Sequence, residues 1–179
     1  MKKVIWVCGV IAGIISVSWG VVAEGLLNDS LSLNTRMIFG YATMILGFSL
    51  IFVAIKNHRD NHNNGQITFG KALGIGLLIT LIASTVYVVV WMIDFSYFVP
   101  DFGEKYQAQA LAEMKASGAS AAEIQRQGAE MAATFQKYNT SFTFRAMFTY
   151  LEIAPVGIVI SLIAALILKK NAKPATVNV

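Results

Sequence analysis

The most constraining feature of this chain is a long apolar run near its C-terminus, residues 146–168. It carries one charge, Glu152, and one helix breaker, Pro155, and it is followed by two lysines. At about 1.5 Å per residue, a helix of this length crosses a hydrocarbon core of about 30 Å. The run therefore predicts a membrane-spanning helix. The acid inside it is a candidate functional residue, because a charge in lipid is costly.

Three further apolar runs precede this one, at residues 4–23, 37–55 and 72–93. Charged residues make up only 13% of the chain, about half of their usual share in soluble domains. Uncharged runs of this length are too long for the strands of a folded core. We therefore predict an all-α, polytopic membrane protein in which residues 1–179 form a single membrane domain, a bundle of four transmembrane helices.

The first run has two interpretations. Two lysines precede it, and Val21 and Ala23 have the spacing of a signal-peptide cleavage site. However, the run is longer than the usual hydrophobic region of about 7–15 residues, and glycines punctuate it as in a packed helix. We predict an uncleaved first span.

Between the third and fourth spans, over residues 94–145, the composition becomes polar. Ser120 and Glu123 have the spacing of a capping box, and Gly118 suits a helix C-terminus. Apolar side chains recur at helical spacing on two arms, at Phe102, Tyr106, Ala110 and Met114, and at Ile124, Met131, Phe135 and Tyr138. This pattern predicts a helical hairpin over residues 100–138, whose arms pack on each other or on a partner.

The distribution of Lys and Arg predicts the orientation, since cytoplasmic loops are enriched in both. One side of the membrane would carry Lys2, Lys3, Lys56, Arg59, Lys71, Lys169, Lys170 and Lys173. The opposite short loop has Arg36, and the long insert counts little because of its length. We therefore expect both termini in the cytoplasm and residues 94–145 in the periplasm. Aromatic residues would form a belt at the outer interface, namely Trp19, Trp91, Tyr97, Phe98, Tyr138, Phe142 and Tyr150.

Small residues at four-residue steps predict where helices touch, because they allow close backbone approach in lipid. They lie in three of the four spans, at Gly9 and Gly13, at Gly70 and Gly74, and at Gly157 and Ser161. Both packing within the bundle and an interface between copies of the chain fit this pattern.

Four ionisable residues are predicted near the outer ends of the spans: Glu152, Arg145, Asp94 and Arg36. Arg145 lies two turns before Glu152 on the same helix face and is a candidate partner for it. Pro155 removes a helix hydrogen bond and breaks the helix near the acid. Three uses are open: a paired acid that fixes helix register, handling of an ion or proton, and docking of a partner or lipid headgroup.

Other chemistry has little support. His58, Asp60 and His62 could share a face, but a closed zinc site needs four ligands, so we interpret them as part of a solvated turn. Cys8 has no histidine within its span, and the serines lack the elbow motif of hydrolases. No basic stripe with interleaved aromatic residues is present to bind nucleic acid. We predict no catalytic, cofactor-binding or metal-binding residues, and no enzymatic activity.

Several stretches resemble a known family. They are Phe69-Gly-Lys-Ala72, Pro100-Asp-Phe102, Lys115-Ala-Ser-Gly-Ala-Ser120, and Leu151-Glu-Ile-Ala-Pro-Val-Gly157 continuing into Ser161 to Lys170. In these the chain is similar to the domain of unknown function 4199 family, small multipass membrane proteins of Bacteroidetes. The resemblance implies four spans and an inner-membrane location, and it assigns no catalytic or ligand-binding residues.

Two functions are consistent with this sequence. The first is a non-enzymatic accessory or scaffold component of the bacterial inner membrane that presents its hairpin to a periplasmic partner. The second is a small oligomeric transporter or channel that uses Glu152, Asp94 and the break at Pro155. Expected partners are the lipid bilayer, a second copy of the chain, or a membrane or periplasmic protein.

Overall fold

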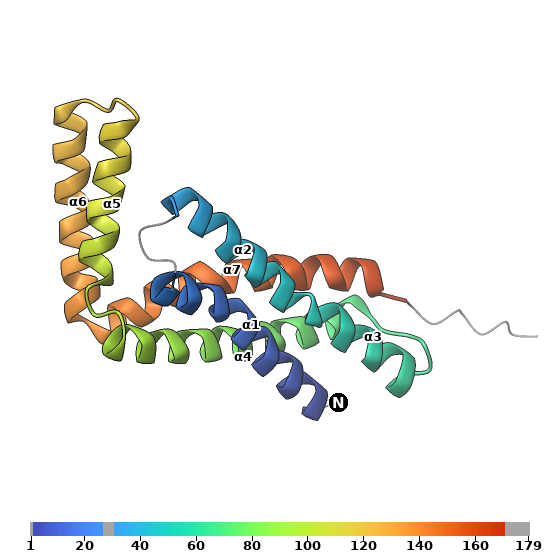
Figure 1. Cartoon of the computed structure of the whole chain (residues 1–179). Helices are drawn as coiled ribbons and strands as arrows, with labels where there is room; N and C mark the ends of the chain where they lie inside the picture. The colour runs from blue at the N-terminus through green and yellow to red at the C-terminus, as the bar shows by residue number, and fades with distance from the viewer. Residues whose placement is uncertain (1, 27–30, 171–179) are drawn as a thin grey trace, which may run out of the picture.

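The computed structural model describes residues 2–26 and 31–170, with the side chains of residues 24–26 excepted, and its fold is all-α (Figure 1). The helices are α1 (Lys2–Leu26), α2 (Leu33–Phe48), α3 (Leu50–His62), α4 (Phe69–Tyr97), α5 (Phe102–Ala116), α6 (Ala121–Thr140) and α7 (Phe142–Leu168). Four candidate spans are long and apolar enough to cross a membrane: Lys2–Ala23, Leu33–His62, Phe69–Tyr97 and Phe142–Leu168. This confirms the prediction of an all-α chain with four membrane-length helices.

The second candidate span is longer than the predicted residues 37–55, because α2 and α3 follow each other with only Ser49 between them. Ser32 caps the start of α2, since its side chain accepts a hydrogen bond from the Thr35 amide. At the other end the helix continues to His62. It stops before the Asn64-Gly65 turn, whose residues have positive φ angles of 50° and 75°. The turn ends the helix because αL backbone does not continue a right-handed helix.

Small residues bring α1, α4 and α2 together. A Cβ added to Gly13 would lie 2.7 Å from the Ala83 carbonyl oxygen, and one added to Gly9 would lie 2.7 Å from Ile82 Cβ. Gly47, which the sequence analysis did not single out, meets the Ala12 carbonyl in the same way, at 2.6 Å. These contacts bring backbones close, as expected where little hydrophobic force drives helices together in lipid.

The contact between α4 and α7 follows the same rule. A Cβ added to Gly157 would collide with Thr80 and with the ring of Phe48. One turn further along, Gly76 lies against Ser161, whose hydroxyl is 3.1 Å from the Thr80 hydroxyl. Gly70 and Gly74 on α4 do not pack within the bundle, contrary to one of the two sequence-based alternatives. A Cβ at either position meets no described atom within 4 Å, and Gly76 makes the close contact instead.

Pro155 does not break α7, contrary to the sequence-based expectation. The helix is continuous from Phe142 to Leu168 with the proline inside it. Proline removes one backbone hydrogen bond, and in a membrane helix neighbouring helices compensate for that loss. Here Ile153 and Gly157, on either side of Pro155, are both buried.

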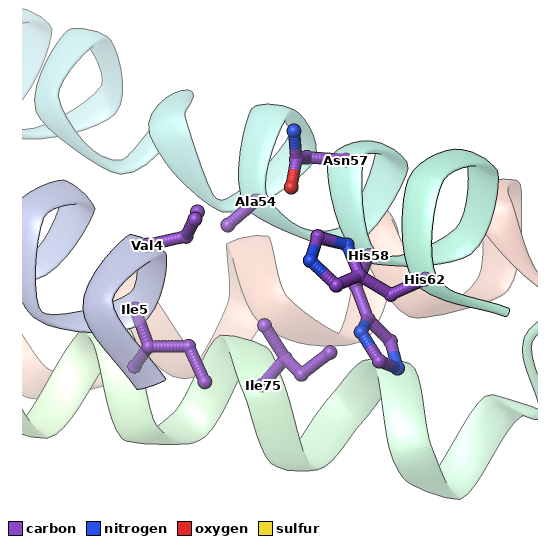
Figure 2. A pocket seen from close by; sticks show the side chains of 7 residues that line it. All are labelled: Val4, Ile5, Ala54, Asn57, His58, His62 and Ile75. Atoms are coloured by element: carbon purple, nitrogen blue, oxygen red, sulfur yellow. The ribbon is translucent and has the colours of Figure 1, made fainter. Parts of the chain in front are cut away.

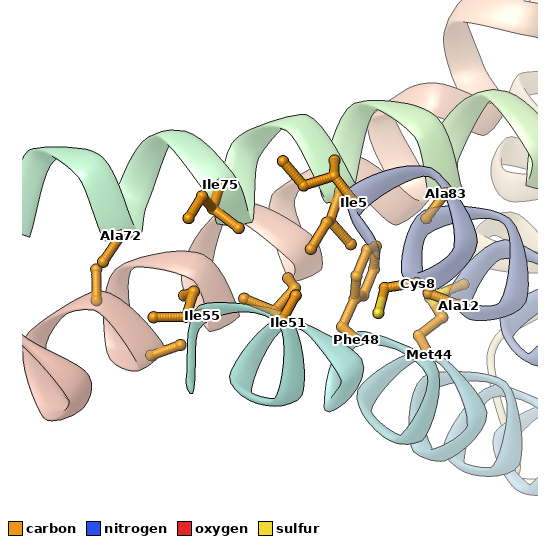
Figure 3. Close-up of a cluster of buried hydrophobic side chains, with 14 of the residues drawn as sticks. Ile5, Cys8, Ala12, Met44, Phe48, Ile51, Ile55, Ala72, Ile75 and Ala83 are labelled. Carbon is orange, nitrogen blue, oxygen red and sulfur yellow. The ribbon is translucent and has the colours of Figure 1, made fainter. Parts of the chain in front are cut away.

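Apolar side chains fill the interior between these helices (Figure 3). Phe48, Ile51 and Ile55 from α2 and α3 are fully buried against Ile75 and Ile79 of α4. The cluster extends over Ile5, Cys8 and Ala12 of α1, so the first span belongs to the core of the bundle. This packing closes the half of the bundle that lies farther from α5 and α6.

The hairpin formed by α5 and α6 lies crosswise at one end of the bundle, opposite the marked N-terminus (Figure 1). Its arms pack on each other, as one of the two sequence-based alternatives stated: the rings of Tyr106 and Phe135 are 5.6 Å apart. Leu111 faces Gly128, and the Gln107 side chain donates to the Gly128 carbonyl oxygen at 2.9 Å. We call this end of the bundle the hairpin end.

Gly13, which packs against a neighbouring helix, and Gly74, which lies in open space, allow a matched test. We expect Gly13→Ala to destabilise the protein by about 1–3 kcal/mol, because a methyl group there overpacks against a backbone carbonyl that cannot rotate away. Gly74→Ala makes the same chemical change in open space, and should be neutral or stabilise by up to about 1 kcal/mol through helix propensity. Thermal unfolding of both variants in detergent measures the difference. Equal effects of the two substitutions would contradict the packing described here.

Candidate functional site

A cavity of about 480 Å³ opens between the hairpin and the bundle. It is bounded by α1, α2, α4, α5, α6 and α7, and its lining is mainly apolar and aromatic. The described residues that line it are Ser16, Trp19, Gly20, Ala23, Leu33, Arg36, Met37, Gly40, Tyr41, Met44, Tyr87, Trp91, Phe102, Tyr106, Thr134, Phe135, Tyr138, Phe148 and Glu152.

A network of aromatic side chains holds one wall of this cavity in place. Trp91 on α4 donates its indole N–H to the Tyr138 hydroxyl at 2.5 Å, and its ring meets Phe102 edge to face at 5.0 Å. Tyr138 in turn packs edge to face on Phe148 of α7, at 5.9 Å. Edge-to-face pairs of this kind are favourable beyond the area they bury. The wall therefore connects α4, α5, α6 and α7.

Of the aromatic residues predicted to form an interfacial belt, Tyr150 shares a hydrogen bond with the Thr85 hydroxyl at 2.8 Å, and the other six divide into two groups. Trp19, Trp91 and Tyr138 line the cavity. Tyr97 and Phe98 are 79% and 75% exposed, and Phe142 is also exposed, as expected of residues that face the membrane surface. Aromatic content alone did not separate the two groups, because the same side chains suit an interface and a pocket wall.

Arg145 is buried beneath this wall, where it makes no ion pair with Glu152 or with any other described acid. Its guanidinium group stacks over the Phe95 ring at 4.0 Å and donates to the Tyr138 and Asn139 carbonyl oxygens at 3.0 and 3.4 Å. Those two carbonyls belong to the last turn of α6. Arg145 therefore anchors the hairpin to α7, which is a structural role.

Glu152 and Arg36 do share one site, since both side chains line the cavity. The hydroxyl of Tyr87 is 3.5 Å from Glu152 Oε1, at the long limit of a hydrogen bond. Trp19 donates its indole N–H to the backbone carbonyl of Arg36 at 3.1 Å, which ties α1 to α2 at the edge of the cavity. Of the predicted polar cluster, the structure thus brings together the acid of α7 and the arginine of α2.

Asp94 lies apart from this pair. Its side chain is 7% exposed, and Oδ2 accepts no hydrogen bond from any described residue. The backbone carbonyl of Asp94 accepts from the amides of Phe98 and Val99 at the end of α4. Asp94 is absent from the described cavity lining, so the four predicted ionisable residues do not form one cluster.

The hairpin is held over the cavity by polar contacts with the start of α2. Glu113 Oε1 accepts from the Leu33 amide at 2.9 Å and from Gln109 Nε2 at 3.0 Å. Gln109 also donates to the carbonyl oxygen of Leu31 at 2.8 Å. These bonds satisfy backbone groups at a helix N-terminus, which otherwise lack partners. Sequence reasoning missed both side chains, because they lie among many similar polar residues on α5.

The two histidines lie at the opposite end, on α3, and not in a solvated turn as predicted (Figure 2). His58 is buried, and neither of its ring nitrogens bonds to a described residue. The His62 ring is 6.0 Å away, and with Asn57 the pair borders a cavity of only about 10 Å³. No group of three potential His, Cys, Asp or Glu ligands converges within residues 2–26 and 31–170. The absence of a metal stays a prediction.

Removal of the Arg145 anchor should loosen the hairpin. Arg145→Gln leaves at least one buried α6 carbonyl without a donor, and we expect a loss of about 2 kcal/mol or more. Arg126→Gln is the control, since Arg126 is an exposed hairpin residue paired with Glu123 and Glu130, and exposed pairs contribute at most about 1 kcal/mol. Thermal unfolding and tryptophan fluorescence measure the effect. Equal stability of the two variants would show that Arg145 is not the anchor.

Comparison with known proteins gives one match. A family model described as "Protein of unknown function (DUF4199)" matches residues 8–170, nearly the whole chain, which confirms the resemblance drawn from the sequence. No curated protein and no solved structure shows a significant match.

Proposed function

Because the chain belongs to this family of unknown function, we propose a function from its geometry: a non-enzymatic membrane protein that binds a small, largely apolar molecule beneath its hairpin. The observation that carries the proposal is the cavity of about 480 Å³. Its size falls within the range of about 300–1,000 Å³ that is typical of small-molecule sites. Apolar walls with a few polar groups are the usual composition of such sites.

The walls of the cavity support a binding role, because contacts outside the cavity hold them in place and leave its interior open to a ligand. Arg145 holds the aromatic wall from its buried side, and Glu113 and Gln109 of the hairpin bond it to the start of α2. The cavity is also open, since Met37 and Phe148 in its lining are 55% and 50% exposed. An open, preformed site allows a ligand to enter without the cost of reorganising the fold.

We further propose that the hairpin lies on the periplasmic side of a bacterial inner membrane, with both termini in the cytoplasm. The support is the concentration of Lys and Arg at the end of the bundle opposite the hairpin. On this side the hairpin would also be the part of the chain that meets a partner protein, which is the accessory role expected from the sequence. The apolar faces of its arms are already used against each other. A partner would therefore contact its charged faces, such as that of Arg126 with Glu123 and Glu130.

Transport is the second candidate, favoured by the position of Glu152 on the cavity wall. The route onward is closed in this conformation by Phe48, Ile51, Ile79 and Ile153, which are fully buried in the core. Between Lys71 and Asp94, α4 carries no charge. Transport would therefore need a second conformation of the bundle, whereas binding needs only the one described.

The orientation can be tested by labelling single cysteines in a Cys8→Ser background. A membrane-impermeant maleimide added to intact spheroplasts should label Ser120→Cys, at the hairpin turn, and should leave Asp60→Cys unlabelled until the membrane is lysed. Protection of position 120 together with labelling of position 60 would reverse the proposed orientation.

The binding function can be tested by filling the cavity. Gly20 lines it, and a Cβ at this position meets no described atom within 4 Å, so Gly20→Leu should occupy the space without disturbing the helices. Native mass spectrometry of the chain released from membranes should detect a small-molecule adduct on the wild type that is lost from this variant. Gly70→Leu, in open space outside the cavity, is the control and should retain the adduct. Absence of any adduct, or its retention by Gly20→Leu, would oppose the proposal.

A further inference from the structure

We propose that the cavity beneath the hairpin recognises an organic cation, an ammonium or phosphonium group on an apolar body, through the Glu152 carboxylate and the aromatic rings around it. This inference rests on the proposed function, because it names the class of molecule that the same cavity would bind. It adds that one residue, Glu152, selects the charge of the ligand.

The carboxylate of Glu152 has few partners of its own. Glu152 is the only acidic side chain among the described lining residues. A carboxylate can accept about four hydrogen bonds, yet the one bond given to Glu152 is the long one from Tyr87, at 3.5 Å. Glu152 is exposed and lines the open cavity, so a ligand can reach its carboxylate. A positively charged ligand would supply the ion-pair and hydrogen-bond partner that the described side chains do not.

Aromatic side chains line the cavity together with the carboxylate. Tyr87 and Trp91 of α4, Tyr138 of α6 and Phe148 of α7 line the cavity together with Glu152. Aromatic faces attract cations, and aromatic cages are a common means of binding quaternary ammonium groups. The wall already holds one cation on its buried side, because Arg145 lies 4.0 Å from the Phe95 ring centre and 5.9 Å from that of Tyr138.

The positive charge in the cavity lining, Arg36, lies nearer the hairpin end than Glu152 does. α2 and α7 run in the same direction, and a Cβ at Gly157 would touch the Phe48 ring, so these two residues lie at one level. Arg36 lies 12 residues before Phe48 on α2, and Glu152 lies five residues before Gly157 on α7. At about 1.5 Å per residue, Arg36 is therefore about 10 Å nearer the hairpin end than Glu152. At that separation Arg36 does not neutralise the acid by direct contact. A bound molecule would place its cationic group at Glu152, away from the positive charge of Arg36.

The size of the cavity sets the scale of the ligand. A volume of about 480 Å³ exceeds the need of a metal ion or a simple ammonium ion and suits a drug-sized molecule. Removal of apolar surface from water would supply most of the binding free energy. The carboxylate would then supply the selectivity for charge.

The test uses two ions of nearly equal size and shape, tetraphenylphosphonium and tetraphenylborate, with the full chain in lipid nanodiscs. Binding is measured by titration calorimetry and by quenching of tryptophan fluorescence, with empty nanodiscs to correct for partition into lipid. We expect the wild type to bind the cation at least about tenfold more tightly than the anion, because opposite charges attract strongly in a partly dehydrated site. Glu152→Gln should abolish that preference, and Glu152→Asp should preserve it. Glu130→Gln, the same change on the exposed face of α6, should leave it unaltered.

Each result of this experiment has a definite meaning. Equal affinity for the two ions, a preference for the anion, or a preference that survives in Glu152→Gln would overturn the charge assignment. The proposed function would stand in those cases, provided that Gly20→Leu blocks binding of both ions. Failure of the wild type to bind either ion would overturn the cation site, and the adduct test with Gly20→Leu would then decide the proposed function separately. The wild-type comparison can overturn the proposal without any variant, so a variant that fails to fold does not remove the test.

Discussion

Close approach of helix backbones at small residues is the contact on which the rest of this structure depends. Gly9 and Gly13 of α1 and Gly157 of α7 meet α4 where a methyl group would collide. In lipid, packing rather than the hydrophobic effect holds helices together. Tight packing of this half of the bundle provides the rigid base for the remainder. The polar contribution is small, and the Thr80 and Ser161 hydroxyls supply one contact across the same interface.

The hairpin end is organised by different forces. There the helices diverge enough to leave a cavity, and aromatic rings and side-chain hydrogen bonds replace glycine contacts. Arg145 illustrates how a membrane helix accommodates a buried charge without an acid: its donors satisfy carbonyls at the end of α6, and an aromatic ring covers its face. This is a satisfied buried cation. Because Arg145 is used in this way, Glu152 does not have it as a partner and instead lies on the cavity wall.

The sequence predicted the parts of the candidate site more successfully than their arrangement. Glu152 and Arg36 were identified because ionisable residues in apolar helices stand out, and the structure brings this pair to one cavity. Asp94 was grouped with them on depth, and Arg145 on depth and a shared helix face, but the structure places both elsewhere. Tyr87 was missed, since one tyrosine in an apolar helix carries no signal of the direction it faces. Only the crossing of the helices decides which residues at one depth share a cavity.

Four membrane-length helices and the helical hairpin were determined by the sequence alone, because run length and periodicity are local properties. The continuity of α7 through Pro155, the use of Gly76 in place of Gly70 and Gly74, and the placing of the hairpin across the bundle were decided only in the tertiary structure. Each depends on which helix face meets which neighbour. That choice is a non-local balance of packing and hydrogen bonding, which a one-dimensional pattern does not record.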